Sequence, residues 1–349
     1  MTLITYVTRI HFADRILEDA LAEELARCNS RRPLIVAEAD PATDAVIERL
    51  FDALPVRAEP VHFTGAGDRL TAGDLPSARR THGEAGCDAL IGFGGARPLD
   101  LARLMGAALG APVIAVPTRT ESVGLGSLGV PFARTGAGHR TVPNAILCDA
   151  TLTLAADAPT TAAAGMVALV HCLEAYLGTA YNPPADGIAL EGLRRAARYL
   201  EQAVAEPADL GARRELLAAA LNAGLAAQKG LGGIEAAARA LEAEAAPEIR
   251  RGSCHAALLP EILAFNAPAI TDRLAAIAGS VGLPAGGDPV TALVDLARRV
   301  DLPARLAALG VEAGMLAAAA AGAAEDVANR TNPRHATARD YHTMMLAVL

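Results

Sequence analysis

The stretch Gly165-Met-Val-Ala-Leu-Val-His-Cys-Leu-Glu-Ala-Tyr176 is the most informative in this chain of 349 residues. It carries one histidine, His171, among apolar neighbours, and Val167 lies four residues before it. Residues at i and i+4 share one face of a helix, so Val167 and His171 lie on the same face. An isolated histidine on an apolar face is usually a core residue, and lining a cleft is the alternative interpretation.

The composition is that of a globular protein, with 52% hydrophobic and 20% charged residues. The formal net charge of −8 argues against nucleic acid as a partner. No segment reaches ~18 apolar residues without a charge or a helix breaker, and no secretion signal is evident, so we expect no membrane partner. The five scattered cysteines form no Cys-x-x-Cys pair, which indicates reduced thiols in a cytoplasmic protein.

The first part of the chain alternates short apolar runs with helical stretches. The expected strands are 33–37, 56–63, 88–93 and 112–116, and the expected helices are 44–54, 77–86 and 98–109. Alternation at this spacing predicts a parallel sheet with crossover helices. After Asp149, helical segments rich in Ala, Leu, Glu and Arg follow, and β-branched runs become rare. We therefore predict an α/β domain over 1–155 and an all-helical domain over 156–349.

Two glycine-containing loops each follow a predicted strand. The first, Ile91-Gly-Phe-Gly-Gly-Ala-Arg-Pro-Leu-Asp-Leu-Ala-Arg103, also opens a predicted helix. Backbone amides at such a turn, with the helix dipole behind them, suit a pyrophosphate. A tight connection without a ligand is the alternative. The second loop is Pro117-Thr-Arg-Thr-Glu-Ser-Val-Gly-Leu-Gly126.

Glu38 follows the first predicted strand. An acidic side chain at this point accepts hydrogen bonds from an adenosine ribose and favours NAD over NADP. The alternative is that Glu38 and Asp40 are solvated turn residues. Arg97, in the first glycine loop, could clamp a phosphate, which favours NADP, or it could occlude the path of a cofactor. The choice between the two cofactors stays open, with NAD slightly favoured.

A further segment, Arg250-Arg-Gly-Ser-Cys-His-Ala-Ala-Leu-Leu-Pro260, places Arg251 one helical turn before His255. Together these motifs resemble the iron-containing alcohol dehydrogenase family, close to its maleylacetate reductase branch. The resemblance implies a dehydroquinate synthase-like fold: a Rossmann-like parallel-sheet domain and an all-helical domain, with the active site in the cleft between them. It also implies a homodimer.

The resemblance implies which residues contact the cofactor. The first loop is similar to the family pattern Gly-Gly-Gly-Ser-x-x-Asp-x-x-Lys, with Arg103 in place of its lysine. The second loop is similar to Pro-Thr-Thr-x-Gly-Thr-Gly-Ser-Glu, with Glu121 in place of its first glycine. The implied contacts to NAD or NADP are Glu38, Gly94, Gly95, Ala96, Arg97, Asp100, Thr118, Thr120 and Ser122.

Most metal ligands of the family are absent. The family's Asp, four residues before His171, is Val167, and one of its histidines is Arg251. Its other histidine must be missing, because no histidine lies between His171 and His255. A divalent metal needs about three protein ligands. Cys254 could complete a new set with the two histidines, but adjacent helical residues point ~100° apart. We therefore expect no metal.

A fixed positive charge on Arg251 could replace the charge of the metal and orient a substrate carboxylate or polarise a carbonyl. An exposed arginine near a helix start is the alternative. His171 or His255 would relay the proton, because imidazole titrates near working pH. The leading hypothesis is a metal-independent NAD(P)(H)-dependent oxidoreductase acting on a small, acidic carbonyl or alcohol substrate.

Two other hypotheses stay open. In the first, the altered loops belong to a redox-neutral lyase, isomerase or cyclase. A cofactor that copurifies without net oxidation would favour this hypothesis. Alternatively, the chain is a non-catalytic, degenerate homologue that acts as a partner subunit. Failure to bind any nucleotide, together with stable association with an active paralogue, would indicate this third function.

Overall fold

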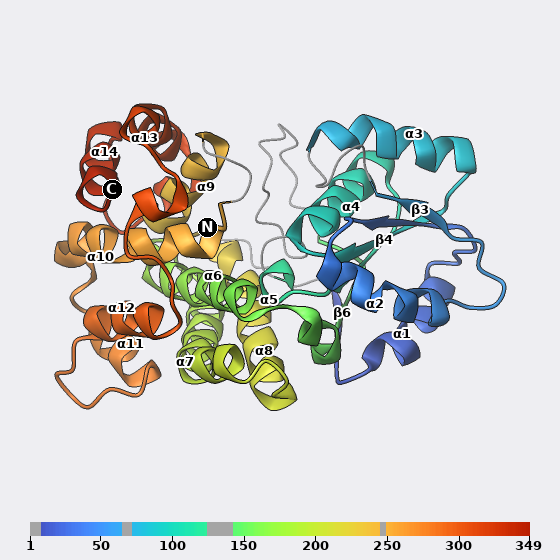
Figure 1. Ribbon diagram of the computed structural model, residues 1–349, viewed down its shortest axis with the longest axis horizontal. Coiled ribbons are helices and arrows are strands. Elements are labelled where there is room, and N and C mark those ends of the chain that lie inside the picture. Colours follow the sequence, from blue (N-terminus) through green and yellow to red (C-terminus); the bar gives the residue numbers. More distant parts are fainter. Residues whose placement is uncertain (1–7, 65–71, 124–141, 245–248) are drawn as a thin grey trace. The chain divides into compact units, whose positions relative to one another are not determined.

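The computed structural model of the chain describes residues 8–64, 72–123, 142–244 and 249–349 (Figure 1). It separates into two compact units, and the division falls between Ala156 and Asp157. The predicted boundary lies one residue earlier.

The N-terminal unit is built on one parallel sheet with the strand order β1-β6-β5-β4-β2-β3. Its strands are β1 (Arg9–Phe12), β2 (Pro33–Ala37), β3 (Val61–Phe63), β4 (Ala89–Gly94), β5 (Val113–Pro117) and β6 (Ala145–Cys148). Strands β2, β4 and β5 are buried along their whole length. Their continuous apolar sequences arise because both faces of the sheet are covered. The predicted parallel sheet is confirmed.

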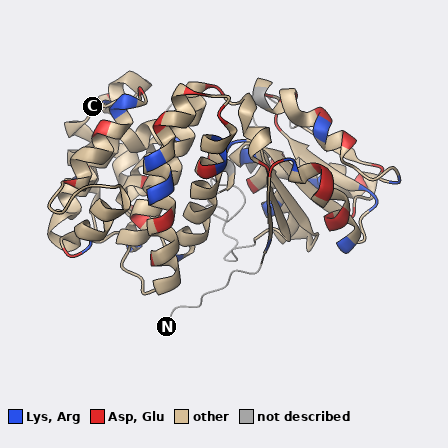
Figure 2. Ribbon diagram, turned by 90° about the horizontal axis from the view of Figure 1, so that it is seen from below, with Lys and Arg blue, Asp and Glu red and all other residues tan. Residues whose placement is uncertain are grey.

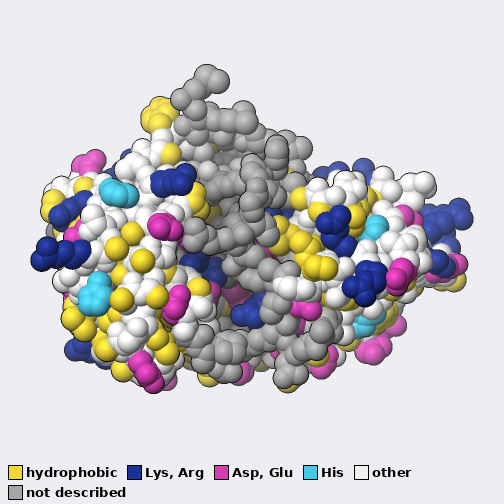
Figure 3. All heavy atoms as spheres, turned by 90° about the horizontal axis from the view of Figure 1, so that it is seen from above, with side chains coloured by type: hydrophobic (Ala, Val, Ile, Leu, Met, Phe, Trp, Pro, Cys, Tyr) yellow, Lys and Arg dark blue, Asp and Glu magenta, His cyan; other side chains and the backbone are white. Residues whose placement is uncertain are grey.

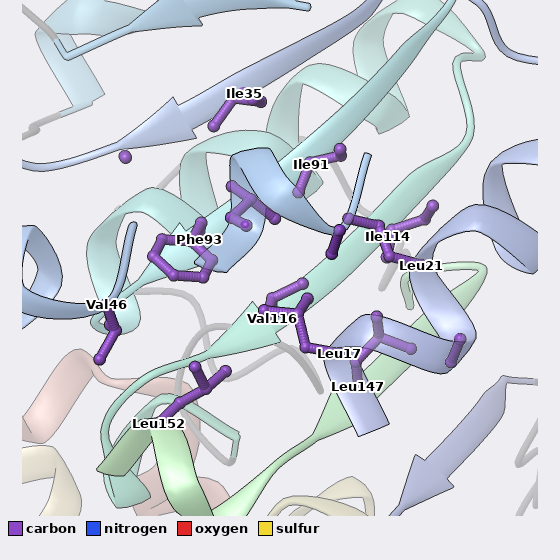
Figure 4. Packing of buried hydrophobic residues seen from close by; sticks show 14 of the residues in the cluster. Leu17, Leu21, Ile35, Val46, Ile91, Phe93, Ile114, Val116, Leu147 and Leu152 are labelled. Carbon is purple, nitrogen blue, oxygen red and sulfur yellow. The ribbon is translucent and has the colours of Figure 1, made fainter. Parts of the chain in front are cut away.

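Helices cover both faces of this sheet. Helices α1 (Ile16–Arg27) and α2 (Pro41–Asp52) pack on one face, where the core drawn in Figure 4 includes Leu17, Leu21, Val46, Phe93 and Val116. Helices α3 (Leu75–Ala85) and α4 (Ala96–Leu109) pack on the other face, where the core includes Ala78, Leu101 and Met105. The unit also contains the short helices η1 (Ala72–Asp74), α5 (Thr120–Ser122) and η3 (Ala150–Ala155).

Two predicted boundaries were wrong for local reasons. Helix α2 begins at Pro41, earlier than predicted, because Asp40 Oδ2 accepts hydrogen bonds from Thr43 Oγ1 (2.6 Å) and Thr43 N (3.3 Å) and so caps the helix. Strand β3 is shorter than predicted: only Val61–Phe63, the last part of the predicted strand, pairs with β2. Pro60, directly before it, has no N–H to donate to the ladder.

The strand order reverses next to β2. The chain passes from β2 to β3 on one side and then to β4 on the other side. In such sheets ligands bind outside the carboxyl ends of the two strands at the reversal. Strand β2 is followed there by Glu38, and β4 ends at Gly94. The sheet therefore places these two predicted cofactor residues at the same edge.

The C-terminal unit is helical throughout its described part, as predicted. Its longer helices are α6 (Ala158–Leu177), α7 (Pro183–Ala205), α8 (Leu210–Ala226), α9 (Gly233–Glu244), α10 (Arg251–Ile270), α11 (Leu274–Ser280), α12 (Pro289–Arg299), α13 (Leu316–Glu325) and α14 (Ala338–Ala347). Short 3-10 turns occur at η4 (Ala227–Lys229), η5 (Leu306–Leu309), η6 (Ala313–Met315) and η7 (Val327–Arg330). Helix α6 packs against α7, α8, α9 and α10.

By length and composition alone, helix α6 is long and apolar enough to cross a membrane. The sequence analysis predicted no such segment. However, 89% of its apolar window is buried inside the protein, as in a core helix. Elsewhere, charges of both signs are spread over the helices (Figure 2). On the face seen in Figure 3, basic, acidic and apolar side chains are interspersed among the described residues.

Candidate functional site

Three helices of the C-terminal unit bring His171, Glu235 and His255 together. His171 lies on α6, Glu235 on α9 and His255 on α10. Oε2 of Glu235 lies 3.0 Å from Nε2 of His171 and 2.9 Å from Nε2 of His255. All three side chains are fully buried. Two of the three predicted catalytic residues therefore meet at one carboxylate oxygen.

Glu174 fixes where α9 begins and therefore where Glu235 lies. Its carboxylate accepts hydrogen bonds from the backbone N–H groups of Gly232 (3.0 Å), Ile234 (2.6 Å) and Glu235 (3.2 Å). Burial raises the pKa of Glu174 to about 8, against the lowering effect of these amides. Because Glu174 is one turn after His171 on α6, a single helix face supplies both the imidazole and the cap.

Two guanidinium groups hold the other oxygen of Glu235. Oε1 accepts from Arg239 Nε at 2.8 Å and from Arg251 Nη1 at 3.1 Å. Burial alone would raise the pKa of Glu235, but the charges of Arg251, His171 and Arg239 outweigh it and hold that pKa well below its ordinary value. Glu235 is therefore an ionised carboxylate inside the protein.

Arg251 points at protein carboxylates. Its Nε and Nη2 donate to Glu242, and only 9% of its side chain is exposed. Burial would lower the pKa of Arg251, but Glu242 and Glu235 raise it. The alternative of an exposed arginine near a helix start was wrong. The positive charge of Arg251 therefore helps to keep Glu235 ionised.

The three clustered side chains are the group that a metal ion would use. One ligand atom from each of His171, Glu235 and His255 lies within 4.8 Å of the other two, and the donor types suit a transition metal. Glu235 Oε2 already accepts from both Nε2 atoms, and two buried guanidinium groups supply positive charge to the same carboxylate. A divalent ion bound here would compete for Glu235 with both imidazoles and with two guanidinium groups.

Glu235 was not predicted, because no histidine lies between His171 and His255 and an acidic residue in an alanine-rich helix carries no distinct signal. Glu235 lies in the first turn of α9. Arg239 follows it four residues later, a spacing that favours an ion pair within a helix. Cys254, considered as a third ligand, is outside the cluster. Burial raises the pKa of its thiol to about 12, so it stays protonated.

In the N-terminal unit, the first glycine loop lies where α4 begins. Gly94 has φ +128°, and Gly95 is the N-cap of α4. A Cβ on Gly95 would lie 2.5 Å from Oε1 of Glu38, so only glycine admits that carboxylate so close to the helix start. Ala96 is the first residue of α4 and Arg97, half-buried, is the second.

Glu38 is paired rather than solvated. Only 6% of Glu38 is exposed, and its Oε1 lies 3.7 Å from Nη2 of Arg119. The same nitrogen lies 2.5 Å from Oδ2 of Asp40. Burial would lower the pKa of Arg119, but Glu121, Asp40 and Glu38 together raise it. The alternative of a solvated Glu38 was wrong, and Arg119 is a residue that the sequence reading did not assign.

The other predicted cofactor residues lie nearby on the same unit. Asp100 is buried and forms an ion pair with Arg103. Thr118 donates its backbone N–H to Gly94 O at 3.0 Å, and its buried Oγ1 has no hydrogen-bond partner among the described residues. Thr120 is buried at the start of α5. The side chain of Ser122, and residues 124–141 of the second loop, lie outside the described part.

Comparison with known proteins gives consistent matches along the chain. The model for the iron-containing alcohol dehydrogenases matches residues 8–126, and the model for the C-terminal part of the Fe-containing alcohol dehydrogenase family matches residues 161–349. The 4-hydroxybutyrate dehydrogenase of Cupriavidus necator is 33% identical over 99% of this chain and 99% of its own. The maleylacetate reductase of Rhizobium sp. is 30% identical over 83% of this chain and 82% of its own. The crystal structure of a Rhizobium maleylacetate reductase matches with a TM-score of 0.83 and 26% identity, covering 100% of this chain and 97% of that one.

Proposed function

The chain belongs to the iron-containing alcohol dehydrogenase family, and from that membership we propose that it is a metal-independent, NAD(H)-dependent oxidoreductase of a small carbonyl or alcohol substrate that carries a carboxylate. That the chain is an oxidoreductase follows from the dehydrogenases and reductases among its relatives. The absence of a metal, the choice of NAD and the acidic substrate are our proposals.

The observation that carries the proposal is the replacement of metal charge by guanidinium charge. Arg251 stands where the family has a metal-binding histidine, and Glu235 stands between His171 and His255. Two arginines keep Glu235 ionised in the protein interior. Both guanidinium groups are paired with protein carboxylates, so their part in this proposal is to hold Glu235 ionised beside the two imidazoles.

The relatives support an acidic substrate. One is a 4-hydroxybutyrate dehydrogenase and another a maleylacetate reductase, and both names denote a substrate with a carboxylate group. NADH, when bound, supplies the hydride. In this proposal the imidazoles of His171 and His255 supply the proton to the carbonyl oxygen in reduction and remove it in oxidation.

We expect the purified protein to oxidise NADH with small aldehydes and ketones that carry a carboxylate, and to react more slowly with matched compounds that lack it. Chelators should leave the rate unchanged, because no step needs a divalent ion. The measurement is NADH absorbance over such a substrate panel, with and without EDTA, together with elemental analysis of the protein. Inhibition by chelator that zinc or iron reverses would overturn the metal-free part.

A nucleotide that copurifies without turnover would instead favour the redox-neutral hypothesis, and failure to bind nucleotide would favour the partner-subunit one.

The residues around Glu38 support NAD over NADP. Three carboxylates, those of Glu38, Asp40 and Glu121, act on the single guanidinium of Arg119. The excess negative charge would repel a 2′-phosphate, whereas Glu38 can accept hydrogen bonds from the two hydroxyls of an NAD ribose.

Replacing Glu38 by Ser should shift cofactor preference toward NADPH, because the variant loses the ribose acceptor and frees donors of Arg119 for a 2′-phosphate. We expect the NADH-to-NADPH ratio of kcat/KM to fall by about 10-fold to 100-fold, the equivalent of one hydrogen bond to a charged group. The matched control is the double variant Glu38→Ser/Arg119→Thr, which should lose NADH use without gaining NADPH use. An unchanged ratio in the single variant would remove Glu38 from the ribose site.

A further inference from the structure

Arg119 holds its guanidinium close to the start of α4. A Cβ on Gly95, the N-cap of that helix, would lie 3.2 Å from Arg119 Nη1 and 3.5 Å from Arg119 Cζ. The backbone amides at the start of a helix attract anions, and α4 has 14 residues behind them. The structure therefore places a guanidinium beside the amides that are expected to bind the pyrophosphate of a dinucleotide.

Arg119 is anchored through one nitrogen and keeps other donors for a ligand. Its ion pairs with the described residues use Nη2, which lies 3.7 Å from Glu38 Oε1 and 2.5 Å from Asp40 Oδ2. Nη1 is the Arg119 nitrogen nearest to Gly95, and Nε is buried without a hydrogen-bond partner among the described residues. Because 22% of the side chain is exposed, the guanidinium can be reached from solvent.

Thr118, directly before Arg119, has a polar atom that the described residues leave unused. Only 1% of Thr118 is exposed, and its Oγ1 is buried without a partner there. Its backbone N–H donates to Gly94 O at 3.0 Å, so Thr118 lies beside the first glycine loop. Buried polar atoms without a partner are rare in native proteins and commonly mark the place of a ligand or a water.

A phosphate at this helix end needs a cation, because a carboxylate already lies there. Glu38 Oε1 would be only 2.5 Å from a Cβ on Gly95, closer than any atom of Arg119. An ionised carboxylate so close to the amides repels a phosphate that approaches them. The guanidinium of Arg119 offsets that repulsion, and it can also donate a charge-assisted hydrogen bond to the phosphate.

We propose that Arg119 is a specificity-determining residue of the cofactor site: Nη2 stays on Glu38 and Asp40, and Nη1 donates to the 5′-diphosphate of NAD at the start of α4. The inference rests on the proposed function and adds a residue to which neither the loop motifs nor the relatives give a role. The family pattern Pro-Thr-Thr has an uncharged threonine at this position. One guanidinium thus links the ribose acceptor Glu38 to the binding of the phosphates.

Replacing Arg119 by Met should weaken the binding of NADH and of ADP by about 10-fold to 100-fold, the effect of losing one hydrogen bond to a charged group. The affinity for adenosine, which has no phosphate, should change much less. Isothermal titration calorimetry with the three compounds measures both effects, and their difference separates a lost phosphate contact from a general loss of structure.

Arg32→Met is the matched control for removing a paired arginine from the same unit. Arg32 pairs with Glu59 and directly precedes β2, whereas Glu38 follows the other end of that strand. The control variant should bind NADH, ADP and adenosine as the wild type does.

Replacing Asp40 by Asn should change the affinity in the opposite direction. Asparagine can cap α2 as Asp40 does, but the variant loses one negative charge beside Arg119. The affinity for ADP should therefore rise by about 2-fold to 5-fold, the effect of a partly exposed charge pair. A purely structural role for Arg119 does not predict effects of opposite sign.

Equal ADP affinities in Arg119→Met and the wild type would overturn the inference. If Arg119→Met does not fold, an ADP affinity in Asp40→Asn that is unchanged or lower would overturn it. A wild-type protein that binds adenosine 2′-phosphate more tightly than ADP would also do so, because Arg119 would then act on the ribose side.

These results are distinguishable from failure of the proposed reaction. ADP binding that depends on Arg119, without turnover of any substrate, would support the inference and contradict the reaction. Turnover with NADH together with equal ADP affinities would contradict the inference alone. A wild-type protein that binds no nucleotide would contradict both.

Discussion

Replacing Gly252 by Ala should destabilise the C-terminal unit by about 3 kcal/mol or more, beyond the common range for overpacking. Gly252 is on α10 and faces the backbone of α6. A Cβ at this position would lie 1.9 Å from Ala163 O and 2.5 Å from Ala163 C. Backbone atoms cannot rotate away as a side chain can, so the two helices must separate. Thermal and urea unfolding followed by circular dichroism would measure the loss.

The same substitution should reduce turnover, because α10 carries His255 and α6 carries His171. The ring centroids, 5.6 Å apart, would separate with the helices. Gly187→Ala, on α7, is the control, because a Cβ there meets nothing within 4 Å. It should be neutral or stabilising by up to about 1 kcal/mol through helix propensity. Equal unfolding midpoints for Gly252→Ala and the wild type would show that the helices are not in contact at this point.

The parallel sheet could be predicted because its signals are local. Each inner strand is a short apolar run bounded by polar or glycine residues, and Gly94 with Gly95 marks a strand-to-helix turn. Strands β1 and β6 and helix α1 were not predicted; β6 is an apolar run of the same kind, whereas β1 and α1 lack such contrast. Their core residues, such as Leu17 and Leu21, are recognisable only once the face of the sheet they cover is known.

The site could be predicted only in part, because its partners are distant in sequence. His171 and His255 stand out as histidines in apolar segments, and Arg251 stands out as a replaced ligand. Glu235 has no such signal: it is one of many acidic residues in helices rich in alanine. The role of Glu235 depends on where α9 begins. Glu174, on α6, fixes that point by accepting hydrogen bonds from three backbone N–H groups. A tertiary contact of this kind leaves no periodic pattern.

Replacing Arg251 by Met should be the most destabilising change to a charged residue of the site. The variant keeps the apolar volume but removes the guanidinium from two carboxylates, Glu235 and Glu242. Glu235 is fully buried and, among the described residues, would retain Arg239 as its one guanidinium partner. Breaking one side of a buried ion pair costs about 3–5 kcal/mol, because the remaining charge is left without compensation. Arg250→Met, at the exposed neighbouring position, should change stability by less than about 0.5 kcal/mol.

The loss in Arg251→Met should depend on pH in a defined direction. In the wild type the pKa of Glu235 is held well below 4.5, its value in an unfolded chain, so its stabilising contribution is complete above that pH and is lost as pH falls through the folded-state pKa. Without Arg251, the effect of burial dominates and the folded-state pKa of Glu235 rises. The variant therefore loses most free energy of unfolding at pH values where Glu235 is ionised in the unfolded chain. The stability difference should therefore be largest near neutral pH, shrink as pH falls through the raised pKa of Glu235 in the variant, and disappear below the lowered pKa of Glu235 in the wild type. Urea unfolding of both proteins across this range measures it, and a difference independent of pH would mean that the guanidinium does not hold the charge of Glu235.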